Sequence, residues 1–123
     1  MSFETAGYNY RSPLLVGALG RAWLAFCPQD ERRAILRSIG VRQGQALTAT
    51  LERIRHAGWA FTVPPRPTRL HGMAVPILEK ERVLGCISIR FPRSAMTEDE
   101  VAVRFGRRLR TLARAIASDV ARH

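Results

Sequence analysis

The sequence predicts an α+β domain in which helices pack on an antiparallel sheet. Two observations carry this prediction. The stretch from His71 to Phe91 alternates like two strands joined by a polar turn at Glu79, Lys80 and Glu81. Amphipathic helical patterns lie on either side of this hairpin. The 123 residues, 46% of them hydrophobic, fit a single domain over residues 1–123 that can bury a core without disulfide or metal staples.

Side chains of the hairpin divide into a bulky row and a small row. The bulky row on the first strand is Met73, Val75 and Ile77, and the second strand matches it with Val83, Gly85, Ile87, Ile89 and Phe91. The other row is Gly72, Ala74 and Pro76, followed on the second strand by Leu84, Cys86, Ser88 and Arg90. If the bulky rows share a face, helices pack there, and the other face is the floor of a small-molecule pocket. The alternative is a sheet with one dry and one solvated face.

Before the hairpin, the pattern predicts a strand and three helices. The apolar run Pro13 to Ala18 is typical of a strand. Leu19 to Cys27 has helical spacing, which assigns Trp23 to the core. Further helices are expected over Gln29 to Ile39 and over Gln45 to Ala57. Each of these two is followed by a terminating glycine, Gly40 and Gly58.

The remaining segments complete the predicted order. Trp59 to Val63 is extended, and three prolines make Val63 to Leu70 a connecting loop. After a loop over Arg93 to Met96, Thr97 and Glu100 have the spacing of a capping box. The helix that starts there runs nearly to the C-terminus with an apolar stripe of Val101, Phe105, Leu109, Leu112, Ile116 and Val120.

The net charge of +10 raises the question of nucleic acid. Almost all of this charge is arginine, Lys80 being the only lysine, and the arginines are scattered along the chain. No helix-turn-helix or RNA-binding signature accompanies them. An arginine-rich surface is therefore favoured, and a basic nucleic-acid-binding module remains the alternative. No apolar run approaches the roughly 20 residues of a membrane span, so we expect no membrane partner.

Catalytic and metal-binding patterns are weak in this sequence. His56, His71 and His123 are not spaced as metal ligands. Cys27 and Cys86 lie far apart in apolar contexts without a nucleophile signature, which favours inert thiols in a reducing cytoplasm. No phosphate-binding, dinucleotide-binding or nucleophile-elbow motif occurs. We therefore expect neither an enzyme nor a bound cofactor or metal.

Five blocks together resemble a known family. ALGRAWLAFCP, LERIRHAGWAF, GMAVPI, VLGCISIRFP and SAMTEDE follow one another as in the effector-binding domain of the IclR family of bacterial transcription regulators, and the resemblance extends from Ser12 to the C-terminus. It implies a GAF-like antiparallel sheet with flanking helices that binds a small organic-acid effector. It also implies homo-oligomers, dimers or tetramers, and contact with DNA only through an N-terminal winged helix-turn-helix domain absent from this chain.

The resemblance also implies a set of ligand-binding positions. They fall at Thr62, Gly72, Ser88 and Arg90, with the backbone near Ala18 and Gly20 on the far side of the pocket. Ala74 and Cys86 belong to the same small row and join the candidate site. Many members have Cys at the position of Gly72, Ser at that of Arg90, and Asp at that of Thr62. These departures imply a larger site with an added cation, suited to an aromatic or otherwise larger carboxylate held by Arg90 and Ser88.

Two further expectations follow from the resemblance. Family effector domains begin before this chain does, so we expect an N-terminally truncated domain whose exposed sheet edge pairs with another copy. The expected function is ligand sensing, in which the effector shifts the arrangement of subunits and thereby DNA affinity. A small enzyme, the third class considered, would need turnover that no residue of the sequence predicts.

Overall fold

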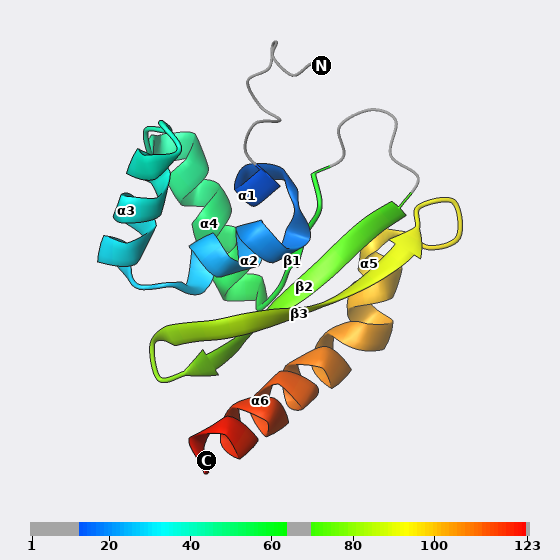
Figure 1. Ribbon diagram of the computed structural model, residues 1–123. Helices are drawn as coiled ribbons and strands as arrows, with labels where there is room; N and C mark the ends of the chain where they lie inside the picture. The colour runs from blue at the N-terminus through cyan, green and yellow to red at the C-terminus, as the bar shows by residue number, and fades with distance from the viewer. Residues whose placement is uncertain (1–12, 64–69, 123) are drawn as a thin grey trace.

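The computed structural model describes residues 13–63 and 70–122 as three layers (Figure 1). The middle layer is a three-stranded antiparallel sheet of order β1-β2-β3, formed by Ala60–Phe61, Leu70–Glu79 and Arg82–Pro92. The helices from α1 to α4 lie on one side of it, and α5 and α6 lie on the other. The predicted α+β architecture is therefore confirmed. None of the described helices is long and apolar enough to cross a membrane.

The hairpin has the register that the two rows predicted. Met73 pairs with Ile89 and Val75 with Ile87, so the bulky rows share one face. A register shift follows Ile77, and Lys80 turns the chain with a φ of 57°. The bulky face packs on the C-terminal helices, where Met73, Val75, Phe91, Val101, Leu109 and Ala113 form a buried cluster.

The predicted C-terminal helix is present, but its buried apolar face moves to other residues after a π-helical turn. A capping box between Thr97 and Glu100 starts α5 (Glu98–Val101), a π-helical turn η2 (Ala102–Gly106) follows, and α6 (Arg107–Ala121) continues. Residues of a π turn advance less around the axis than α-helical residues, so later side chains rotate by about one position. Ala113 is therefore buried, whereas Leu112 and Val120, assigned to the stripe, are each 49% exposed.

The predicted strand over Pro13 to Ala18 is wrong. Pro13–Val16 forms the short helix α1, and after Gly17 the chain continues as α2 (Ala18–Phe26). A proline suits the first turn of a helix, and a short apolar run carries too little periodicity to distinguish strand from helix. The carbonyl of Val16 accepts the N–H of Val63 at 2.8 Å, which joins α1 to the segment after β1.

The other two predicted helices are confirmed as α3 (Gln29–Ser38) and α4 (Gln45–Ala57). Gly58 ends α4 in the left-handed conformation, with a φ of 98°. Buried Arg32 of α3 donates to the carbonyls of Leu24, Ala25 and Cys27 and so ties α3 to the end of α2. Trp23, assigned to the core, is half-buried and donates its Nε1–H to Glu31 at 3.0 Å. Most of the loop predicted over Val63 to Leu70 lies outside the described residues.

Candidate functional site

A cleft of about 470 Å³ opens between α1 and α2 on one side and, on the other, the start of β2 and the end of β3. Most of its lining side chains are small or absent, which leaves the space unfilled. Cavities of about 300–1,000 Å³ are typical of small-molecule sites. The described lining residues are Leu14, Gly17, Ala18, Leu19, Gly20, Thr62, Gly72, Ser88 and Arg90.

The small row of the sheet is only partly open, because α2 packs across its middle. Ala74 is fully buried beneath this helix in a cluster with Ala18, Ala22 and Leu24. Cys86 packs against the same cluster, and its Sγ donates weakly to the carbonyl of Leu19 at 3.8 Å. Burial raises the pKa of the Cys86 thiol to about 11, which keeps it protonated at neutral pH.

The structure thus brings together six of the eight candidate positions and separates two. Ala18, Gly20, Thr62, Gly72, Ser88 and Arg90 line the cleft, whereas Ala74 and Cys86 lie under α2 and do not. Sequence reasoning missed Leu14, Gly17 and Leu19, because it assigned the segment that carries the first two to a strand.

Close backbone contact builds the wall of the cleft that α1 and α2 form. A Cβ atom on Gly20 would lie 2.5 Å from the Cα of Leu14 and 2.9 Å from its carbonyl oxygen. Carbon atoms normally approach to about 3.5–4.0 Å, so only glycine lets α2 sit this near to α1. Gly20 therefore fixes the position of α1 at the mouth of the cleft.

Thr62 and Gly72 hold the floor of the cleft through two hydrogen bonds. The Thr62 N–H donates to the Gly72 carbonyl, and the Gly72 N–H donates to Thr62 Oγ1, each at 3.0 Å. A Cβ atom on Gly72 would lie 3.1 Å from Thr62 Oγ1 and 3.5 Å from the Cβ of Ala18. A larger side chain at this position would occupy the cleft itself.

Arg90 is the one charged side chain among the described residues of the cleft lining. It is exposed and lies opposite Gly72 in the hairpin, while half-buried Ser88 lies opposite Ala74. The ion pairs found in the described part of the chain, His71 with Glu98 and Asp119 with Arg122, do not include Arg90. Its guanidinium therefore has no carboxylate partner there and can meet an anion that enters the cleft.

On the opposite face of the same strand ends lies a buried histidine that the sequence did not single out. His71 Nε2 lies 2.5 Å from Glu98 Oε2, and its Nδ1 has no hydrogen-bond partner within residues 13–63 and 70–122. Its ring stacks on Phe61 with centroids 6.0 Å apart and meets Phe91 edge-on at 5.3 Å. These contacts anchor the start of α5 to His71, and His71 immediately precedes Gly72 of the cleft floor.

Within residues 13–63 and 70–122, no group of three or more His, Cys, Asp or Glu side chains could hold a metal ion. The described cleft lining likewise contains no carboxylate, histidine or cysteine that could act as an acid, base or nucleophile. The chemistry available at the cleft is hydrogen bonding by Ser88 and Thr62, ion pairing by Arg90, and apolar contact with the helices.

Comparisons with known proteins agree on one family. Residues 5–118 match the family described as bacterial transcriptional regulator IclR C-terminal. The probable transcriptional regulator SauR of Cupriavidus necator is 32% identical over 100 residues, covering 74% of this chain and 40% of that relative. The chain thus spans about two-fifths of the length of this relative.

Two solved structures have the same fold. The C-terminal domain of the transcriptional regulator KdgR of E. coli is 26% identical, with a TM-score of 0.71 over 87% of this chain and 70% of that one. The inducer-binding domain of PobR from Acinetobacter, a double mutant in complex with 3-hydroxybenzoic acid, has a TM-score of 0.71 at 12% identity. That comparison covers 86% of this chain and 66% of the PobR chain, and it shows the fold alone.

Proposed function

The chain belongs to the family of bacterial transcriptional regulator IclR C-terminal domains, and we propose that its cleft binds a small organic acid, aromatic in class, as a regulatory effector. The observation that carries the proposal is the guanidinium of Arg90, which has no ion-pair partner among the described residues and lies at a cleft whose described lining is otherwise uncharged. The family and its relatives are transcription regulators rather than enzymes. The effector is therefore sensed and released unchanged.

In the proposed complex, Arg90 holds the carboxylate of the effector. A guanidinium offers two parallel N–H groups that match the two oxygens of a carboxylate. Ser88, two residues earlier on β3, contributes a hydroxyl that hydrogen-bonds the same carboxylate or a ring substituent. Leu14 and Leu19 supply apolar contact for an aromatic ring. The binding of 3-hydroxybenzoic acid by the PobR domain supports this class of ligand.

Coupling to the rest of the regulator would pass through the strand ends. Gly72 and Arg90 face the cleft, while their neighbours His71 and Phe91 face α5. Because successive residues of a strand point to opposite faces, a ligand that shifts Gly72 or Arg90 also shifts the anchor of α5. We propose that this contact transmits binding to α5 and α6, and thereby to DNA-binding parts of the whole protein in the cytoplasm.

We also propose that the domain acts as a homo-oligomer. Arg21 donates to the carbonyl of Phe61 on the outer side of β1, whereas β3 pairs only with β2 among the described strands. The other edge of β3 (Arg82–Pro92) therefore has no neighbour among the described strands, and an open edge of this length is a template for pairing with a second copy. Light scattering across a range of concentrations tests this, and a monomer at every concentration would count against it.

The experiment for the ligand is a thermal-shift panel of aromatic, dicarboxylic and small oxo-acids, followed by calorimetric titration of each hit. An acid at 100 times its dissociation constant stabilises the fold by about 2.7 kcal/mol. We expect aromatic acids to give the largest shifts. Arg90→Ala should abolish binding, and the matched variant Arg93→Ala, just beyond β3, should bind like the parent chain.

A second variant separates charge from space. Gly72→Leu keeps Arg90 but fills the floor of the cleft, so it should also abolish binding. Undiminished binding by Arg90→Ala would overturn the carboxylate assignment. Undiminished binding by both variants would mean that the ligand occupies another part of the molecule.

Hydrogen exchange tests the coupling. A saturating aromatic acid should change amide exchange over Glu98–Gly106, which begins at the His71–Glu98 contact. Glu98→Ala should still bind the acid, but the exchange change over this segment should be lost. Retention of the change in Glu98→Ala would contradict this route.

A further inference from the structure

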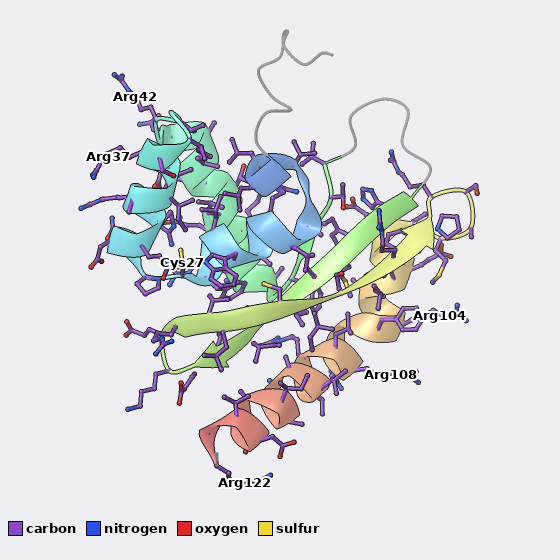
Figure 2. All side chains as sticks on the ribbon, viewed as in Figure 1. Cys27, Arg37, Arg42, Arg104, Arg108 and Arg122 are labelled. Carbon is purple, nitrogen blue, oxygen red and sulfur yellow. The ribbon has the colours of Figure 1, made fainter. Side chains whose placement is uncertain are left out.

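A strongly basic surface lies on the outer side of the C-terminal helix, away from the cleft. Between Val101 and Ser118 the chain has five arginines and no carboxylate. All five are exposed. Four of them are named here the arginine face: Arg104, Arg107, Arg108 and Arg114. Figure 2 shows Arg104 and Arg108 extending from the helix away from the sheet.

The charge of the arginine face is not neutralised within the described part of the chain. The ion pairs found there join His71 to Glu98 and Asp119 to Arg122, and neither includes a member of this face. The fifth arginine, Arg110, has its guanidinium against Gly58, where it would be 3.0 Å from an added Cβ. It lies three residues from Arg107 and four from Arg114, spacings at which like charges repel on a helix.

We propose that the arginine face contacts the phosphate backbone of duplex DNA without reading its sequence. From Arg104 to Arg114 the helix rises about 15 Å, a length along which duplex DNA carries about nine negative charges. Arginine forks suit phosphate oxygens, and phosphate contacts require no recognition helix in a groove. Because the chain belongs to a family of transcriptional regulators, the polyanion that we assign to this surface is DNA.

The arginine face is separate from the cleft. The cleft is lined by residues of α1 and α2, and these helices lie on the other side of the sheet from α6 (Figure 1). A regulator bound to its operator would gain a second, non-specific contact from this domain. Such a contact contributes affinity and sets the salt dependence, whereas the choice of sequence remains with other parts of the protein.

The test is fluorescence anisotropy of a labelled 30-base-pair duplex of arbitrary sequence, titrated with the 123-residue chain between 50 and 150 mM NaCl. Four phosphate contacts give a slope of log K against log salt of about −3.6, which is a loss of about 50-fold over this range. The variant Arg104→Gln/Arg107→Gln/Arg108→Gln/Arg114→Gln should bind too weakly to measure at 150 mM, with a slope near zero.

A matched control removes the same number of charges from other surfaces. Arg33→Gln/Arg37→Gln/Arg42→Gln/Arg93→Gln also lowers the net charge by four, but its arginines lie on or near α3 and after β3. Figure 2 shows Arg37 and Arg42 at the far side of the molecule from Arg104. The control should keep a slope close to that of the parent chain.

A milder variant keeps the test valid if the fourfold variant fails to fold. Arg104→Gln/Arg108→Gln removes two of the contacts, so the slope should fall to about −1.8. Equal loss in the control and the arginine-face variants would overturn the proposal, because net charge would then suffice. Absence of salt-dependent binding by the parent chain would overturn it as well.

Poly-L-glutamate serves as the competing partner. At equal concentrations of negative charge, it should displace the duplex poorly, because carboxylates on a flexible chain lack the fixed phosphate array. Displacement as effective as that by unlabelled duplex would overturn the DNA assignment in favour of an acidic protein partner.

Discussion

Replacing Gly20 by alanine tests the wall of the cleft most directly. The added methyl would lie 2.5 Å from the Cα of Leu14, about 1 Å inside normal contact. The clashing atoms are backbone, so no side-chain rotation relieves them, and α1 must move outwards. Overpacking costs about 1–3 kcal/mol, and a clash with three backbone atoms belongs to the upper part of that range, about 2–3 kcal/mol. Alanine within a helix gains back about 1 kcal/mol over glycine.

We therefore expect Gly20→Ala to lower the free energy of unfolding by about 1–2 kcal/mol, measured by urea denaturation followed by circular dichroism. The midpoint of thermal unfolding should fall by about 3–8 °C. Gly85→Ala is the control, because its Cβ would meet only the Ile77 Cδ1 at an ordinary 3.9 Å. That variant should be neutral or slightly stabilising. A Gly20→Ala protein as stable as the parent would refute the close packing of α1 on α2.

Three further predictions concern the other side of the sheet and the half-buried thiol of Cys86. In Gly106→Ala the added Cβ would lie 2.6 Å from the Trp59 ring, so the free energy of unfolding in urea should fall by about 1–2 kcal/mol. In a Trp59→Leu background, the same substitution should have no effect or should stabilise the fold. Glu98→Ala leaves the buried His71 ring unpartnered, so urea unfolding should show a loss of about 1–3 kcal/mol, whereas little loss should follow when His71→Phe is already present. Burial raises the pKa of Cys86 to about 11, so at pH 8 this thiol should react with iodoacetamide about 100-fold more slowly than a thiol of pKa 9, as followed by mass spectrometry. Folding favours the neutral thiol, so the contribution of Cys86 to the free energy of unfolding is present below pH 9 and declines as the pH rises towards 11.

The hairpin could be predicted from sequence because its two constraints are local. Alternation assigns each residue to a face, and the polar turn at Lys80 sets which residues lie opposite. Gly72, Ser88 and Arg90 were therefore placed on one face before any packing was known. The helix starting at Thr97 was predictable for the same reason, because a capping box involves residues only three apart.

Elements that depend on packing were not predictable in this way. The run from Pro13 to Val16 is too short for its period to distinguish a helix from a strand. It is a helix that packs with its Leu14 backbone against Gly20 of α2. The π turn over Ala102–Gly106 accommodates the Trp59 ring against Gly106, a contact between residues far apart in the sequence. No pattern within the helix itself signals that turn, so the stripe beyond it was misassigned at Leu112.

The small row of the sheet and the arginines both show that sequence alone does not reveal which residues are covered in the fold. A row of small side chains suits both an open pocket floor and close approach of a helix, and the structure contains both, with α2 over Ala74 and open space beside Gly72. The arginines are scattered along the sequence, yet the continuous helix of η2 and α6 places Arg104, Arg107, Arg108 and Arg114 on exposed surface. What decides function in each case is which neighbours cover a residue. The described part of the chain leaves both the space beside Gly72 and the arginine face uncovered.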